Sequence, residues 1–157
     1  MSKSQVNIQI AVTHKMYLAI LFGQLVLFAI ALWFVETAKV EFSISGDDFF
    51  SLAVPLFGII MMIVSKFIFT KKIAGIKKEK ELILKLSKYR TAKIIVWAMV
   101  ESASLFSIVL FMSTGRYYYA VVFILIVGYY LLNRPSRGNI VLDLQLSEEE
   151  KSIVLNR

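Results

Sequence analysis

The chain has 157 residues, of which 58% are hydrophobic and 18% charged, and its mean hydropathy is +0.71. Soluble domains carry about 25% charged residues, so this composition excludes an ordinary soluble domain and indicates a protein in contact with lipid. The formal net charge is +7, and the lack of cysteine excludes disulfides, thiolate metal sites and thiol redox chemistry.

Four apolar runs predict membrane-spanning helices. A hydrocarbon core of about 30 Å requires about 20 helical residues, with a range of about 17–25. The last run reaches this length only if Asn133 and Arg134 extend to the lipid headgroups. The chain should therefore be an all-α polytopic membrane protein with four transmembrane helices, at about 16–35, 49–69, 94–112 and 117–133.

The loops between these spans predict the orientation. Residues 70–90 contain eight cations and two acids, whereas residues 36–48 contain one cation and four acids. An excess of Lys and Arg marks the cytoplasmic side. We expect an N-terminus (1–15), a basic loop (70–93) and a C-terminal tail (134–157) in the cytoplasm, and a location in a bacterial inner membrane.

The basic residues of the loop form an expected membrane-surface patch. Each cation near an anionic leaflet contributes about 1 kcal/mol of attraction, so anionic lipid headgroups are the expected partner. The signatures of nucleic-acid binding, which are glycine-rich segments and stacking aromatic residues among the cations, are lacking, and no nucleic-acid partner is expected. The patch consists of Lys71, Lys72, Lys77, Lys78, Lys80, Lys85, Lys88 and Arg90.

The predicted cytoplasmic segments also contain helix signals. Residues 71–90 lack proline and place apolar residues among the lysines, so they are expected to extend the second and third helices. Pro135 should end the fourth span. Ser147 and Glu150 fit a capping box that opens a short helix to about Leu155. Whether these segments dock on the membrane surface or on a partner stays open at this level.

Two polar residues lie near the middle of their spans. Glu101 is the eighth residue of a 19-residue span, and Gln24 is the ninth of 20. An ionised carboxylate at this depth costs about 2.5–3.5 kcal/mol on insertion scales, so it must face protein or water, or be protonated. The Gln24 amide is the simplest expected partner of Glu101.

Helical spacing predicts the surroundings of the acid. Trp97 and Ser104 share a face with Glu101, and Ala98 and Ser102 form a small-xxx-small pair beside it. We therefore expect this face to be a contact between helices. Three interpretations compete: an acid that fixes helix pairing within or between chains, an acid that binds a proton or cation, and an acid exposed to lipid through a misplaced span.

These interpretations lead to two function hypotheses. The first is a non-enzymatic structural or accessory subunit that acts through helix packing and cytoplasmic contacts, as a homo-oligomer or in a membrane complex. The second is a small proton- or cation-coupled transporter or channel, in which Glu101 titrates. No cofactor is expected, and since His14 is the only histidine, we expect neither a metal site nor an enzyme active site. The candidate site consists of Glu101, Gln24, Ser104, Ser102 and Lys66.

A short internal similarity leaves open whether the spans form two similar hairpins. A shift of 78 residues aligns residues 27–32 with residues 105–110, with four identities in six. Each of these helices precedes a short segment and a returning span.

Two family resemblances involve the Glu101 segment. Residues 98–111 resemble the carboxylate-bearing helix of rotor-ring subunits in rotary ATPases, although the glycine-rich stripe of those rings is lacking and the predicted topology is reversed. A broader resemblance, from residue 14 onward, is to an uncharacterised group of four-span bacterial membrane proteins frequent in Bacteroidetes. It implies the membrane class and topology and no activity. The matching features are Phe22-Gly23-Gln24, Arg90-Thr91-Ala92, Trp97-Ala98, residues 101–106, Thr114-Gly115, residues 133–136 and residues 143–147.

Overall fold

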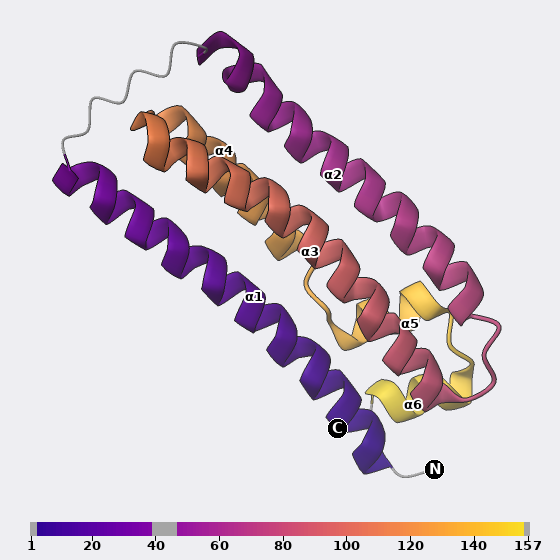
Figure 1. The fold of residues 1–157 in the computed structure, drawn as a ribbon. Coiled ribbons are helices and arrows are strands. Elements are labelled where there is room, and N and C mark those ends of the chain that lie inside the picture. The colour runs from indigo at the N-terminus through magenta and orange to yellow at the C-terminus, as the bar shows by residue number, and fades with distance from the viewer. Residues whose placement is uncertain (1–2, 39–46, 156–157) are drawn as a thin grey trace.

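A computed structural model gives the fold of residues 3–38 and 47–155, and these residues are helical apart from short turns (Figure 1). The predicted all-α class is confirmed. In chain order the helices are α1 (Lys3–Ala38), α2 (Asp47–Ile76), α3 (Leu82–Thr114), α4 (Tyr117–Leu132), α5 (Arg137–Leu144) and α6 (Glu148–Leu155).

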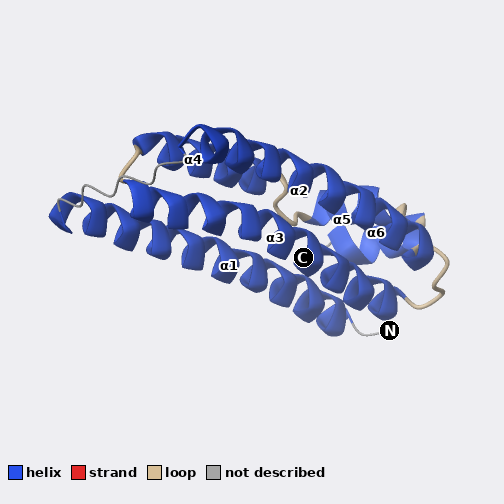
Figure 2. Ribbon diagram, turned by 45° about the horizontal axis from the view of Figure 1, so that its top comes forward, coloured by secondary structure: helices blue, strands red, loops and turns tan. Residues whose placement is uncertain are grey.

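Helix α3 forms the centre of an elongated bundle. Helices α1, α2 and α4 each pack along it, and α1 and α2 lie on opposite flanks (Figures 1 and 2). Helices α3 and α4 are joined by a tight turn in which Gly115 has a φ of 66° and donates a backbone hydrogen bond to Phe111, at 2.8 Å. Helices α3 and α4 therefore pack directly against each other. Helices α1 and α2 instead lie on either side of α3.

Helices α1, α2 and α3 are long and apolar enough to cross a membrane. Helix α4 has 16 residues and reaches span length only together with α5, from which it is bent by 74°. Large apolar side chains cover the outer faces, with Phe22 69% and Phe49 72% exposed. Such continuous apolar exposure is typical of a surface that faces lipid. The described residues thus contain three helices of membrane-spanning length, or four spans if α4 and α5 form one, and the fold is compatible with a membrane protein.

A seam of buried residues holds α1 to the bundle. Its members recur at intervals of seven or four residues, as expected when two helices pack with a heptad period. Only this narrow stripe is fully covered, and partly buried residues such as Phe28 and Leu32 border it. The buried residues are Val6, Thr13, Tyr17, Gln24 and Ala31.

The two ends of the bundle differ. One end, which we call the tail end, contains the α2–α3 turn together with α5 and α6, and the other end contains the turn at Gly115 (Figure 1). The α2–α3 turn covers only residues 77–81, so most of the predicted basic loop is helical, as its lack of proline indicated.

Helices α5 and α6 pack against the tail end of the long helices. Val6 of α1, Leu86 of α3 and Val154 of α6 are buried in one apolar cluster with Ile140 and Leu144 of α5. Arg137 reinforces the packing, because its guanidinium donates to the Val154 carbonyl at 2.6 Å. The segments beyond the fourth span therefore dock on their own chain, an arrangement that the sequence did not indicate.

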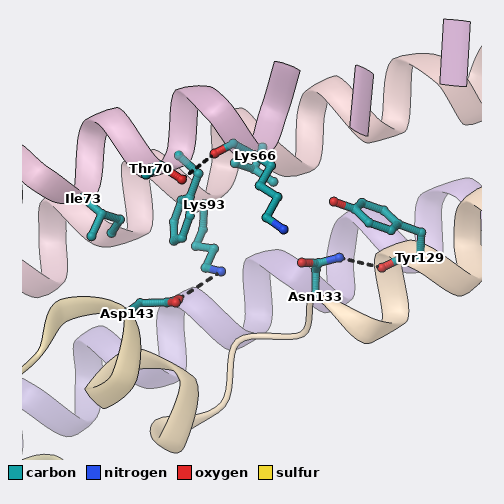
Figure 3. Close-up of a pocket in the computed structure, with 9 residues that line it drawn as sticks. Lys66, Thr70, Ile73, Lys93, Tyr129, Asn133 and Asp143 are labelled. Carbon is teal, nitrogen blue, oxygen red and sulfur yellow. Dashed lines mark hydrogen bonds and ion pairs between the residues drawn. The ribbon is translucent and has the colours of Figure 1, made fainter. Parts of the chain in front are cut away.

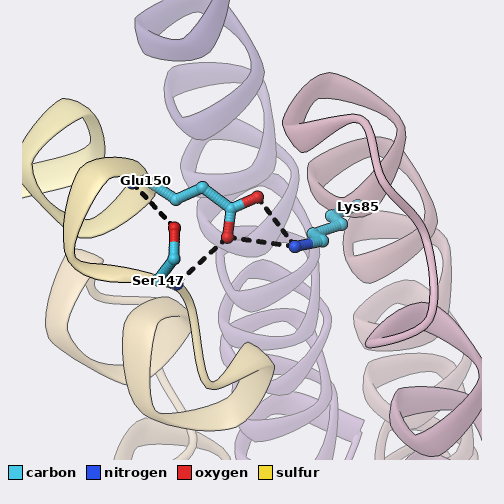
Figure 4. Close-up of polar contacts among 3 residues, drawn as sticks. All are labelled: Lys85, Ser147 and Glu150. Atoms are coloured by element: carbon cyan, nitrogen blue, oxygen red, sulfur yellow. Dashed lines mark hydrogen bonds and ion pairs between the residues drawn. The ribbon is translucent and has the colours of Figure 1, made fainter.

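The predicted capping box of α6 is confirmed. The Glu150 amide donates to the Ser147 hydroxyl at 3.3 Å, and the Ser147 amide donates to the Glu150 carboxylate at 3.1 Å. Lys85 of α3 also donates to this carboxylate, at 2.7 Å (Figure 4). The same side chain thus starts α6 and ties it to α3.

Candidate functional site

Gln24 and Ser104 form the polar contact between α1 and α3 in the middle of the bundle. The Ser104 hydroxyl donates to the Gln24 side-chain oxygen at 2.8 Å, and both residues are fully buried. Ser104 also lies 2.9 Å from the Glu101 backbone oxygen. The expected pairing of Gln24 with the Glu101 carboxylate is therefore replaced by a pairing with Ser104, because the position three residues further along α3 faces α1 more directly.

Glu101 itself lies at the edge of an uncovered side of α3. Its side chain is half-buried, and it takes part in no side-chain hydrogen bond or ion pair with the described residues. Ala98, Ser102 and Val109 beside it are exposed. We call these four residues the open α3 face. The helix contact expected at Ala98 and Ser102 is not made by the described residues of the same chain.

The interior of the bundle contains four buried polar side-chain atoms without partners among the described residues. These atoms are Gln24 Nε2, Trp97 Nε1, Ser107 Oγ and the Tyr119 hydroxyl. Aromatic rings fill much of the space around them, and Tyr17 packs against both Trp97 and Tyr130. The interior is thus a mostly apolar packing with isolated polar groups along one side of α3.

Lys66 lies away from Glu101, at the tail end. It lines a cavity of about 380 Å³ between α2, α3, α4 and α5, which we call the tail-end cavity. Lys93 lines the same cavity and precedes Glu101 by eight residues, or about 12 Å along the helix. The candidate residues therefore separate into two groups, with Glu101, Gln24, Ser102 and Ser104 in mid-bundle and Lys66 at the tail end.

Lys93 is held at this cavity by a carboxylate from α5. Its ammonium lies 3.3 Å from Asp143 Oδ2, which also accepts a hydrogen bond from the Tyr89 hydroxyl at 2.9 Å. Lys93 is 7% exposed and lies just before the predicted third span. Burial lowers the pKa of Lys93, and the Asp143 charge opposes this effect. Burial, and then the Asp143 charge, raises the pKa of Tyr89.

Sequence reasoning missed this ion pair. Asp143 belongs to α5, an eight-residue helix without a strong apolar period, so nothing indicated that it returns to α3. The available signal was the spacing of Tyr89 and Lys93, which places two polar side chains one turn apart on α3.

Part of the predicted surface patch is used inside the chain. Lys85 pairs with Glu150, Lys88 pairs with Glu79, and Arg90 donates to Gln9 of α1 at 2.7 Å. Lys71 lies over the ring of Phe67. Lys72, Lys78 and Lys80 are exposed, and with Lys77 they continue the patch around the α2–α3 turn.

Comparisons with known protein families, curated proteins and solved structures found no match. The resemblance to four-span bacterial membrane proteins therefore stays a prediction, and the function is argued from the residues alone.

Proposed function

We propose that this protein is a non-enzymatic structural or accessory subunit in a bacterial inner membrane. In this proposal it has four spans, like the bacterial membrane proteins that its sequence resembles. It assembles with a second copy, or within a membrane complex, through the open α3 face. The observation that supports this function is the half-buried Glu101 carboxylate, which lies in mid-bundle without a side-chain partner in its own described chain.

The proposed orientation places the tail end in the cytoplasm. The α2–α3 turn, α5, α6 and the basic patch all lie at this end. Cytoplasmic segments carry the excess of Lys and Arg, and anionic headgroups attract them there. Helix α4 then forms a short fourth span, with the bend at Pro135 at the cytoplasmic interface.

The energetic argument concerns the depth of the open α3 face. A carboxyl group near the middle of a bilayer faces protein or water, because exposure to hydrocarbon costs several kcal/mol. Ala98 and Ser102 are small, so another helix can approach closely enough to accept or donate a hydrogen bond at Glu101. Such bonds average about 0.6 kcal/mol and reach about 1.7 kcal/mol, which is enough to select a packing partner.

Three variants test this proposal. Glu101→Gln keeps a hydrogen-bonding group and should assemble like the wild type, whereas Glu101→Leu should weaken self-association by roughly three- to fifteenfold. Ala98→Leu should also weaken it, because the larger side chain separates the helices. Association is measured by cross-linking in native membranes and by the mass of the solubilised complex.

Val121→Leu is the matched control, because it places leucine on an exposed position of α4 outside the open α3 face. A wild-type protein that stays monomeric and without protein partners in native membranes would contradict the proposal. So would equal assembly of all four variants.

A second candidate function is proton- or cation-coupled transport. The observation that favours it is the set of unpartnered buried polar atoms in the interior of the bundle, at Gln24, Trp97, Ser107 and Tyr119, which extends from mid-bundle toward the Gly115 turn. Polar atoms in this position support a hydrogen-bonded path when water enters. Reconstituted wild-type protein should then show flux that depends on pH, and Glu101→Gln should abolish flux while assembly is retained. Wild-type vesicles without flux under an imposed gradient would exclude this function.

A further inference from the structure

The tail-end cavity brings together polar residues from the corresponding ends of three predicted spans. Lys66 lies one turn before the end of the predicted second span, Lys93 just before the third, and Asn133 at the end of the fourth. Figure 3 shows the Lys66 and Lys93 ammonium groups, the Asn133 amide and the Tyr129 hydroxyl around a common space. The cavity therefore lies at the level where a bilayer changes from hydrocarbon to headgroups.

The charges of the cavity are unequal. Asp143 offsets Lys93, whose ammonium lies 3.3 Å from its carboxylate. Lys66 has no hydrogen bond or ion pair from its ammonium to the described residues. The two ammonium groups and the one carboxylate leave the cavity with one net positive charge. This charge matches a ligand group with a single negative charge.

Apolar residues complete the lining. Phe69 and Ile73 of α2 and Val96 of α3 also line the cavity, and the Lys93 ammonium lies 4.1 Å from the centre of the Phe69 ring. A volume of about 380 Å³ falls within the range of about 300–1,000 Å³ that is typical of small-molecule sites. A ligand with a charged head and an apolar body fits these surroundings better than a fully hydrated ion.

We propose that the tail-end cavity binds the phosphate group of an anionic membrane lipid, with Lys66 as the principal cation and Lys93, Asn133 and Tyr129 around it. A phosphodiester carries one negative charge and accepts hydrogen bonds from the two ammonium groups and the Tyr129 hydroxyl, whereas the Asn133 amide nitrogen donates to the Tyr129 backbone oxygen at 2.9 Å. Helix α5 forms the roof through Asp143. The site is separate from the open α3 face and does not depend on the proposed assembly role.

The phosphate site differs in kind from the basic patch. Attraction of the patch to a charged leaflet depends on the number of cations and hardly on which one is removed. A built cavity instead depends on Lys66 specifically. Lys72 provides the comparison, because Lys66 and Lys72 are both exposed lysines of α2 and only Lys66 lines the tail-end cavity.

The experiment measures lipid adducts on the detergent-solubilised full chain by native mass spectrometry. Phosphatidylglycerol and chain-matched phosphatidylethanolamine are titrated separately onto the wild type, Lys66→Met, Lys66→Arg and Lys72→Met. The first phosphatidylglycerol should bind Lys66→Met at least about tenfold more weakly than the wild type, since a hydrogen bond to a charged group contributes about 1.5–3 kcal/mol. Lys66→Arg should retain most of the binding.

Several outcomes would overturn the proposal. Equal weakening in Lys66→Met and Lys72→Met would show surface attraction only. Equal binding of phosphatidylglycerol and phosphatidylethanolamine by the wild type would show that the net charge of the lipid does not determine binding, which contradicts the proposal. A final arm adds inorganic phosphate to the lipid-bound wild type. Displacement of the lipid by inorganic phosphate would assign the cavity to the free ion, whereas retention of the lipid supports the membrane source.

Discussion

Tyr17 of α1 and Tyr130 of α4 donate hydrogen bonds to each other's backbone carbonyl oxygens. The Tyr17 hydroxyl lies 3.4 Å from the Tyr130 oxygen, and the Tyr130 hydroxyl lies 3.2 Å from the Tyr17 oxygen. Their rings are stacked, with centroids 4.8 Å apart. Because α1 and α4 otherwise meet mainly through side chains, this pair fixes the register of α1 against the α3–α4 hairpin.

Replacement of these tyrosines by phenylalanine tests that role. Tyr17→Phe and Tyr130→Phe should each lower the free energy of unfolding by about 0.6–1.5 kcal/mol, because each removes one donor and leaves the stacking intact. The double variant should lose less than the sum of the single losses if the two bonds act as one unit. Unfolding in mixed micelles measures these values. Strict additivity would contradict the coupling.

The ion pair between Lys93 and Asp143 should control the docking of α5 and α6. Asp143→Asn leaves the buried ammonium without its counter-charge and should destabilise the docked tail by roughly 1–3 kcal/mol. Limited proteolysis of the α4–α5 connection reports the fraction of open tail. Asp143→Asn that is cleaved no faster than the wild type would exclude this role.

A pH dependence follows from the lowered pKa of Lys93. The folded state releases this proton at a lower pH than the unfolded chain, so stability rises with pH between the lowered pKa and the ordinary value of about 10.4. Asp143→Asn removes the attraction that opposes the lowering of this pKa, so Lys93 loses its proton at a lower pH than in the wild type. As the pH is raised, the docked tail of Asp143→Asn should therefore regain its resistance to proteolysis at a lower pH than the wild type would. The Lys93→Met/Asp143→Asn double variant is the control and should show no such recovery.

The start of α6 gives a prediction about local order. Ser147→Ala removes one half of the capping box and should cost about 0.5–2 kcal/mol in the first turn of α6. Glu150→Ala removes both the reciprocal bond and the ion pair to Lys85, so it should release α6 more completely. Amide hydrogen exchange over residues 148–152 measures both effects. Equal exchange in the two variants would show that Lys85 contributes nothing to docking.

Close packing of α2 on α4 should depend on Gly58. A Cβ atom at Gly58 would lie 3.4 Å from the Ile126 side chain. Gly58→Ala is therefore tolerated, whereas Gly58→Leu should push the helices apart and destabilise the bundle by about 1–3 kcal/mol. Gly128→Leu is the control, because no atom lies within 4 Å of a Cβ atom at Gly128. Equal loss in the two leucine variants would contradict this account.

The sequence predicted the long helices well, because lipid imposes a strong length and composition constraint on each span. The end of the fourth helix and the capping box of α6 were also readable, since Pro135 and Ser147 act locally. Each of these signals depends on a few neighbouring residues and not on how the helices pack.

The partners of individual side chains were not readable. Gln24 pairs with Ser104 and not with Glu101. This outcome depends on the rotation of each helix about its axis, which an apolar sequence hardly encodes because lipid and protein interior are equally apolar. The tail-end cavity was missed because it depends on how α5 docks on the long helices, and no local signal in α5 indicated that docking.

The apolar cluster at the tail end contains residues from the beginning and from the end of the chain, which are synthesised at different times. Val6 and Val154 lie in the same cluster, although 147 residues separate them along the chain. Because synthesis starts at the N-terminus, α1, α2 and α3 are complete before α6, and this end of the bundle stays unfinished until Val154 has emerged from the ribosome. A nascent chain that stalls before that point therefore leaves part of the apolar cluster exposed.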